Sequence, residues 1–431
     1  MSNRLSEADQ FVAAYKKGAA NLLNNPDSVQ DLANQFTLLT AKGKRSPSHL
    51  ALASRCYNVS RNFISAFNYA SALMRSGQPS LTAFRNALEI APADKRALVM
   101  HHIGLALYDA GNYPAALEHY ASAFAADPDE AEIGHSIAIA KLAHGRLREG
   151  LYEFEVLHHK PVRKAITNSG IPRWNGEDLS GKTVILAHEQ GFGDTLQFIR
   201  FAPKLKALCG SLIFSGPTVL NALIEAQFEF DSVIDEAGPF KADFVTSPMA
   251  ATALMGIEYK DVPNGPYMRS EAMKLSDRGK LKVGLSWKGS PGYANDSLRS
   301  ASLADLCPML DLPGAAFYSL QVNPGPHEIT DLGLDGFVGD LGSLIKDWRD
   351  TAKAIAAMDV VVTVDTANAH LAGAMGKPVM LLLGKAPCWR WAQGPAKWYA
   401  KTKAFPQARA DDWQEQALAA RKELEGMIRG R

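Results

Sequence analysis

The sequence lacks the features that mark several large classes of protein. Its 431 residues include only four cysteines, which form no CxxC pair and have no histidine cluster at metal-binding spacing nearby. Cysteine usage this sparse favours a reduced compartment. The longest apolar runs fall short of the roughly 18 residues of a membrane span, and the polar start MSNRLSEADQ does not resemble a signal peptide. We therefore expect a cytoplasmic protein without a membrane span.

An excess of charge of one sign is also missing. The 46 basic and 45 acidic residues give a formal net charge of +1. The net charge therefore does not favour nucleic acid or an anionic membrane as the partner.

A periodicity of 34 residues runs through the N-terminal third. Gly43, Gly77, Gly111 and Gly145 follow one another at this interval, which is the period of a helix-turn-helix repeat that stacks into a solenoid. The repeat around Gly111 is the clearest, and its small, aromatic and helix-stopping positions resemble the tetratricopeptide pattern at Gly104, Leu107, Gly111, Tyr113, Ala116, Tyr120, Ala123 and Pro128. Residues 1–160 are thus predicted to form an all-helical repeat array.

Such an array presents a concave groove that suits an extended peptide or a partner helix. The alternative is an arm for dimerisation or spacing, so a homo-oligomer stays open. The histidine pairs at 101–102 and 158–159 are adjacent on predicted helices, so each pair points in different directions. They indicate packing or solvated residues, not a metal site.

Two α/β domains are predicted to follow the turn-rich segment 161–181. Short apolar runs at 182–188, 211–215, 232–234 and 243–246 alternate with helical patterns, which is typical of a parallel sheet. After a predicted polar helix, the alternation restarts with strands at 281–287, 317–321, 360–364 and 379–383, and a closing helix at 412–428. The expected domains are residues 161–275 and 276–431.

The first strand of this region runs into a glycine turn with polar side chains. His188 ends the strand, Gly191 and Gly193 form the turn, and Asp194 begins a helical pattern. Ligands bind beyond such strand ends in open α/β sheets. His188 is therefore a candidate for ligand contact or for a catalytic base, and Asp194 is either a turn-stabilising residue or a reactive carboxylate that could be the base instead.

A second turn of this kind follows Val364. Its helix would begin with Asp365, Thr366, Asn368 and His370. A helix N-terminus offers free N–H donors and a partial positive charge to a phosphate. Helix capping by Asp365 or Thr366 is the simpler interpretation, and both roles are compatible.

Three segments together resemble the bacterial tetratricopeptide-glycosyltransferase proteins. They are EQGFGDTLQF at 189–198, GLSWKG at 284–289 and VDTANAHLAGAMGKPV at 364–379. The part from about residue 170 to 415 is similar to the ADP-heptose:lipopolysaccharide heptosyltransferases, and the order of domains is similar to that of O-GlcNAc transferase. The resemblance implies a GT-B fold of two Rossmann-like domains. It also implies an inverting sugar transfer from a nucleotide-diphosphate sugar, without a metal or a cofactor.

The same resemblance suggests roles by position. Asp194 would accept the proton of the acceptor hydroxyl, and Asp365 and Thr366 would contact the donor, with Asn368 and His370 in the same helix turn. Lys288 and Arg299 would neutralise the leaving diphosphate, unless they are only exposed loop charges. The segment GKAPCW at 384–389 departs from the pattern of the relatives, which carry an aspartate in place of Cys388. The sugar and the nucleotide base therefore stay open.

Several alternatives remain after these assignments. The tryptophans at 389, 391 and 398 are either core residues or a stacking wall for a base or sugar. A dehydrogenase is disfavoured, because Leu196 stands where GxGxxG needs its third glycine. The acceptor is predicted to be a protein, with a glycan as the alternative, recruited by the repeat array. The competing hypothesis is an inactive scaffold that holds a nucleotide sugar or a partner.

Overall fold

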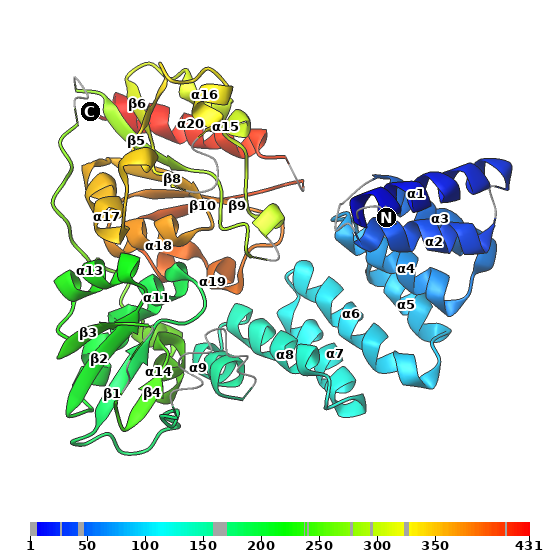
Figure 1. Cartoon of the computed structure of the whole chain (residues 1–431), viewed down its shortest axis with the longest axis horizontal. Helices are drawn as coiled ribbons and strands as arrows, with labels where there is room; N and C mark the ends of the chain where they lie inside the picture. Colours follow the sequence, from blue (N-terminus) through cyan, green and yellow to red (C-terminus); the bar gives the residue numbers. More distant parts are fainter. Residues whose placement is uncertain are drawn as a thin grey trace, which may run out of the picture. The chain divides into compact units, whose positions relative to one another are not determined.

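The computed structural model describes residues 7–25, 28–41, 47–157, 170–236, 238, 241–275, 279–293, 296–322, 327–409 and 412–431. The chain divides into two compact units, Met1–Ala140 and Lys141–Arg431. Figure 1 shows helices alone in the blue to cyan part of the chain, and helices with two sheets in the green to red part. The expected fold class, a helical repeat array followed by two parallel α/β domains, is confirmed.

The first unit consists of consecutive antiparallel helix pairs. Its elements are α1 (Glu7–Asn24), α2 (Val29–Ala41), α3 (Pro47–Ser60), α4 (Phe63–Arg75), α5 (Leu81–Glu89), the 3-10 turn η1 (Ala93–Lys95), α6 (Arg96–Asp109), α7 (Tyr113–Ala126) and the greater part of α8 (Ala131–Ala143). The next helix is α9 (Leu147–Tyr152), which a short π-helix, η2 (Glu153–Leu157), continues.

The predicted turn glycines explain where these helices end. Gly77, Gly111 and Gly145 have φ values of 67°, 76° and 90°, a left-handed conformation that favours glycine because it has no Cβ. The fourth, Gly43, lies outside the described residues. The period of 34 residues is thus the spacing of left-handed turns between paired helices.

Close helix crossing depends on Gly104. A Cβ added there would lie 2.4 Å from Cε1 of Tyr120, a side chain that is 1% exposed. The neighbouring His101 donates to or accepts from Ser136 Oγ at 2.8 Å, and His102 Nδ1 bonds the Leu98 carbonyl. Both histidines therefore serve packing within the array, as the adjacent-pair argument predicts.

The second unit contains two all-parallel sheets. The first has the order β3-β2-β1-β4. Its elements are β1 (Thr183–Ala187), α11 (Phe192–Phe198), η3 (Ile199–Phe201), α12 (Ala202–Lys206), β2 (Ser211–Gly216), α13 (Thr218–Gln227), β3 (Ser232–Asp235), β4 (Phe244–Thr246), α14 (Pro248–Leu254) and η4 (Tyr259–Asp261).

The second sheet has the order β10-β9-β8-β5-β6-β7. Its strands are β5 (Leu281–Ser286), β6 (Ala315–Ser319), β7 (Val338–Asp340), β8 (Val360–Val364), β9 (Val379–Leu383) and β10 (Thr402–Pro406). Its helices are α15 (Leu303–Leu310), α16 (Glu328–Asp331), α17 (Trp348–Ala357), α18 (Ala367–Ala374), α19 (Trp389–Ala392) and α20 (Gln414–Arg429), with 3-10 turns η5 (Asp296–Leu298), η6 (Gly342–Leu344) and η7 (Pro395–Lys397). Figure 1 shows α15 and α20 on one side of this sheet and α17 and α18 on the other.

Each sheet has a point where the strand order reverses direction. In the first sheet this point lies between β1 and β4, where Leu186 pairs with Thr246. In the second it lies between β5 and β8, where Ser286 pairs with Thr363. Loops that leave neighbouring parallel strands diverge at such a point, so a crevice forms at the carboxyl ends of the strands. The predicted site turns follow β1 and β8, and therefore start at these two points.

The structure corrects some expectations on elements. The polar helix expected before β5 is absent among the described residues 268–275, where Met273 N–H instead bonds the Lys353 carbonyl. The expected limit of the repeats at residue 160 lies outside the described residues. The α9 helix belongs to the same compact unit as the α/β domains and packs against α14. In the part of the chain that the structure describes, no helix is both long and apolar enough to cross a membrane.

The contact at Gly104 can be tested by adding one methyl group. G104A should destabilise the array by about 1–2 kcal/mol, because overpacking against buried Tyr120 outweighs the gain in helix propensity of at most about 1 kcal/mol. Urea denaturation followed by far-UV circular dichroism measures this difference. The control is L98A in the same helix, where Leu98 is 40% exposed. This change should alter stability by less than about 1 kcal/mol. A G104A protein as stable as the wild type would contradict the tight crossing.

Candidate functional site

The turn after β1 is built around buried His188. Its backbone N–H bonds the Ser215 carbonyl at 2.7 Å, and its Nδ1 lies 2.7 Å from Thr195 Oγ1. The ring stacks on Phe192 with 5.3 Å between centroids, and the residue is only 1% exposed. The structure thus places His188 beneath the turn, where its side chain ties the strand end to α11.

Asp194 lies in the first turn of α11 and uses both carboxylate oxygens. Its Oδ2 accepts the Gly191 N–H at 2.9 Å, which is the turn-stabilising role considered from the sequence. Its Oδ1 forms an ion pair with Arg390. The carboxylate is 21% exposed, so it keeps access to solvent while it is bonded on both sides.

Arg390 is the residue of this site that sequence reasoning missed. It lies in α19 with its guanidinium 10% exposed, and its Nε donates to Gln197 Oε1 at 2.8 Å. Its Nη1 lies 3.2 Å from Cys388 Sγ, and the group stacks over the Trp389 ring at 4.3 Å. In the sequence this arginine lies between the two tryptophans at 389 and 391. Only the tryptophans were interpreted as candidate binding residues.

The two predicted turns are in direct contact. α11 packs on α18, and a Cβ at Gly193 would lie 2.9 Å from His370 Cδ2 and 3.5 Å from the Ala367 Cα. Glycine is therefore required at 193 because backbone and ring approach closely. The contact places the His188–Asp194 turn beside the Asp365–His370 helix start.

The residues after β8 surround the start of α18. Thr366 is the N-cap, but its side chain makes no capping bond and its Oγ1 lies 3.2 Å from Thr363 Oγ1. Asn368 Nδ2 bonds Ser286 Oγ at 3.1 Å and the Leu320 carbonyl at 3.3 Å. Asn368 thus joins the ends of β5 and β6, while the helix start carries no side-chain cap.

Burial shifts the proton affinities of two groups here. Burial raises the pKa of Asp365, and the charges of Arg299 and Arg390 offset part of that rise. Burial holds the pKa of His370 well below its usual 6.5, and the cations Arg390, Arg200 and Arg299 lower it further. His370 is therefore neutral at pH 7, with Nδ1 bonded to Tyr399 Oη at 2.9 Å and its ring stacked on Trp391.

The two predicted loop cations already have partners. Lys288 forms an ion pair with Glu328, and Arg299 Nε donates to Asp296 Oδ1 at 3.0 Å. The Arg299 guanidinium also lies 4.5 Å from the centre of the Tyr293 ring. A phosphate would have to compete with these carboxylates. The three tryptophans at 389, 391 and 398 are at most 4% exposed, which favours the core interpretation over a stacking wall.

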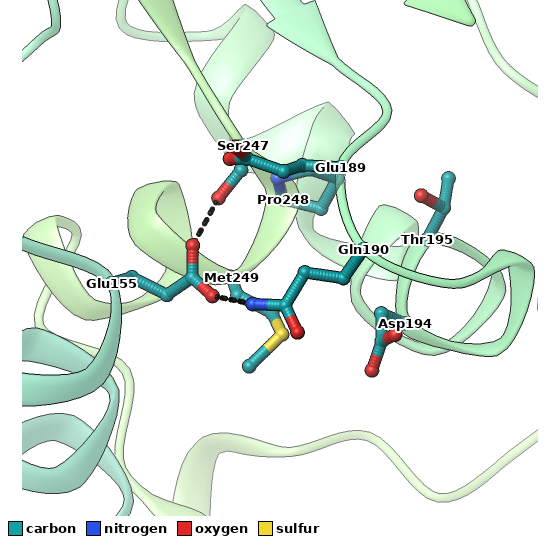
Figure 2. A pocket seen from close by; sticks show the side chains of 8 residues that line it. All are labelled: Glu155, Glu189, Gln190, Asp194, Thr195, Ser247, Pro248 and Met249. Atoms are coloured by element: carbon teal, nitrogen blue, oxygen red, sulfur yellow. Dashed lines mark hydrogen bonds between the residues drawn. The ribbon is translucent and has the colours of Figure 1, made fainter. Parts of the chain in front are cut away.

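A small pocket lies beside Asp194. Figure 2 shows the side chains that line it, with Glu155 reaching toward Gln190 and Ser247. Glu189 also lines this pocket, is 5% exposed, and lies 3.9 Å from Arg173. Within the described ranges, no group of three or more histidine, cysteine or acidic side chains is placed to hold a metal ion.

The neutral state of His370 predicts a pH dependence of stability. In the unfolded chain His370 binds a proton with a pKa near 6.5, whereas in the folded protein it stays neutral in this range. The free energy of unfolding should therefore fall as the pH drops below about 6.5, by up to about 2 kcal/mol at pH 5. H370N should lose less stability than the wild type over this range. All seven tryptophans follow Ala140, so urea denaturation followed by tryptophan fluorescence reports on this unit. Equal pH slopes for the two proteins would refute a buried neutral imidazole.

The chain is distantly similar to known proteins. No model of a protein family matches the chain. The protein FlbA of Caulobacter vibrioides is 26% identical over 374 residues, which are 78% of this chain and 62% of FlbA. The chain thus spans less than two thirds of that relative.

Three solved structures overlap with the chain at low scores. A family 9 glycosyl transferase from Veillonella parvula is 13% identical, with 58% of this chain and 99% of that chain covered and a TM-score of 0.44. The ADP-heptose lipopolysaccharide heptosyltransferase II of E. coli is 12% identical, with 57% and 98% covered and a TM-score of 0.39. An O-GlcNAc transferase mutant of Thermobaculum terrenum is 11% identical, with 100% and 94% covered and a TM-score of 0.30. By its own strand order and repeat turns, the chain has a tetratricopeptide-like array followed by a GT-B glycosyltransferase-like part.

Proposed function

We propose that the chain is an inverting, metal-independent glycosyltransferase that uses a nucleotide-diphosphate sugar. The observation that carries the proposal is the contact between the Asp194 turn and the start of α18. A carboxylate from one parallel sheet there meets a buried cation and an uncapped helix start from the other. Acceptor activation and diphosphate binding are the two tasks that such a pair of groups suits.

The transfer would proceed in a single displacement. The acceptor oxygen attacks the anomeric carbon while Asp194 takes the proton of the hydroxyl. The bond from that carbon to the diphosphate oxygen breaks, and the diphosphate leaves with the electron pair. The start of α18 would hold the diphosphate, with Thr366 nearest and Asp365 toward the sugar.

Arg390 has a dual place in this scheme. It pairs with Asp194, and its charge also acts on Asp365 and His370. An incoming diphosphate offers the guanidinium a stronger anionic partner. The exchange would release Asp194 for the acceptor, while Lys288 and Arg299 require displacement of their own carboxylates before they contribute.

The inactive scaffold is the second candidate, and one observation favours it. Asp194, Lys288 and Arg299 each have an ionic partner in the structure. A protein that only holds a nucleotide sugar, or a partner chain, would have no need to break these pairs. Binding without turnover would identify this case.

A panel of nucleotide sugars separates the two candidates. Thermal stabilisation should single out one diphosphate class, and release of nucleoside diphosphate should follow when acceptor from a cell lysate is added. D194N should keep the stabilisation and lose turnover by about a hundredfold or more, because the general base is removed. E225Q, an exposed change on α13, should match the wild type. Stabilisation of the wild type without nucleoside diphosphate release would favour the scaffold.

The repeat array is proposed to recruit the acceptor, a protein or a glycan. A chain that begins at residue 130 would lack α1 to α7 but keep α8, α9 and η2. It should retain stabilisation by the nucleotide sugar and lose sugar transfer to macromolecules of the lysate. Transfer that persists at the wild-type rate would contradict recruitment and favour an arm for spacing or dimerisation.

A further inference from the structure

Glu155 is a fully buried carboxylate that lies outside both α/β domains. It belongs to η2, the π-helical end of the last repeat helix, and is 1% exposed. A buried carboxylate is costly unless donors satisfy it. The donors that Glu155 uses come from the two loops at the point where the first sheet reverses its strand order.

Each oxygen of this carboxylate has its own donor. Gln190 Nε2 donates to Oε1, and Ser247 Oγ donates to Oε2 at 3.0 Å. Figure 2 shows both bonds, with Asp194 across the same pocket. Ser247 is also the N-cap of α14, since its Oγ accepts the Ala250 N–H at 3.0 Å. Glu155 therefore joins the loop after β1 to the loop after β4.

Gln190 is held in an unfavourable backbone conformation. Its φ is 60°, and among the described residues only Arg61 is another non-glycine with positive φ. Such a residue persists when surrounding contacts impose the conformation. The bond from Glu155 is a contact of this kind, because it fixes the Gln190 side chain in place.

The conformation at Gln190 determines where the next residues lie. Gly191 follows directly, and its N–H donates to Asp194 Oδ2. The chain of contacts thus runs from Glu155 through Gln190 and Gly191 to the carboxylate that pairs with Arg390. A change in the φ of Gln190 would swing the Gly191 N–H away and misplace Asp194.

We propose that Glu155 is a positioning residue for Asp194, so that the last helical element is part of the transferase site. This inference rests on the proposed function for its effect on turnover, and on the structure alone for its effect on the turn. It predicts that the end of the repeat region cannot be altered without loss of order in residues 190–194.

The experiment uses the full chain and two readouts. E155Q replaces one carboxylate oxygen by an NH2 group, which cannot accept a hydrogen bond, so the side chain loses its charge and keeps an acceptor for only one of its two donors. Hydrogen exchange of the peptide 188–198 should become about tenfold faster or more, as expected for loss of a hydrogen bond to a charged group. Release of nucleoside diphosphate should fall about tenfold to a hundredfold through kcat, while stabilisation by the nucleotide sugar persists.

The matched control is E153Q, an identical change two residues away in η2. Glu153 pairs with Lys141 and has no bond to the turn among the contacts described. E153Q should leave both readouts within about twofold of the wild type, because Glu153 pairs with Lys141 of α8 and not with a residue of the turn. S247A removes only the second donor, so exchange of 188–198 should increase less than in E155Q. This variant still tests the proposal if E155Q does not fold.

A swap of the two side chains tests the bond itself. E155Q/Q190E restores a carboxylate and an amide across the same gap, so it should return exchange of 188–198 toward the wild-type rate. The proposal would be overturned if E155Q and E153Q had the same exchange and the same turnover. It would also be overturned if exchange in both S247A and the swap were as fast as in E155Q. Unchanged turnover in D194N together with faster exchange in E155Q would refute the catalytic role of Asp194 and leave the positioning of the turn intact.

Discussion

The ion pair between Asp194 and Arg390 is the interaction on which the α/β part depends. A guanidinium with 10% exposure needs a partner, since an unpaired buried charge typically costs several kcal/mol. The partner comes from a turn 196 residues earlier in the chain, so the two sheets are joined at the place where their loops meet. Arg200 reinforces this union through the carbonyls of Pro263 and Trp398, at 2.8 and 3.0 Å. The contact between domains and the candidate site are therefore the same structure.

The fold was largely predictable because its signals are local. A left-handed turn favours glycine, so the period of 34 residues marked the helix pairs before any contact was known. Strands that are buried on both faces are continuous apolar runs, as β8 and β9 are. The edge strands of the second sheet gave no such signal, since β7 has three residues with a central Gly339 and β10 contains Lys403 and Pro406. Helix α17 was missed for a different reason: its sequence is amphipathic, but its buried residues are mostly alanine and threonine, with Ile355 as the one large apolar side chain among them.

The site was predictable in its location and not in its pairings. Ligands bind beyond the carboxyl ends of parallel strands, so His188 and Asp194 could be assigned to one candidate turn, and Asp365 to a second, from the strand pattern alone. Which cation pairs with which carboxylate depends on side chains that the sequence separates widely, as for Lys288 with Glu328 or Arg390 with Asp194. Glu155 gave no sequence signal, because it lies in a helix of the repeat region and its donors lie in another domain.

The pairings also constrain the order of events under the proposed transfer. Asp194 Oδ1 pairs with Arg390 and Oδ2 accepts the Gly191 N–H, so an acceptor hydroxyl would have to share an oxygen that is already bonded. A buried guanidinium without an anionic partner is costly. Arg390 can therefore leave Asp194 only if another anion takes the place of the carboxylate. A diphosphate at the start of α18 is such an anion. Under the proposed transfer, donor binding would therefore precede acceptor activation, because the diphosphate would draw Arg390 away from the Asp194 carboxylate.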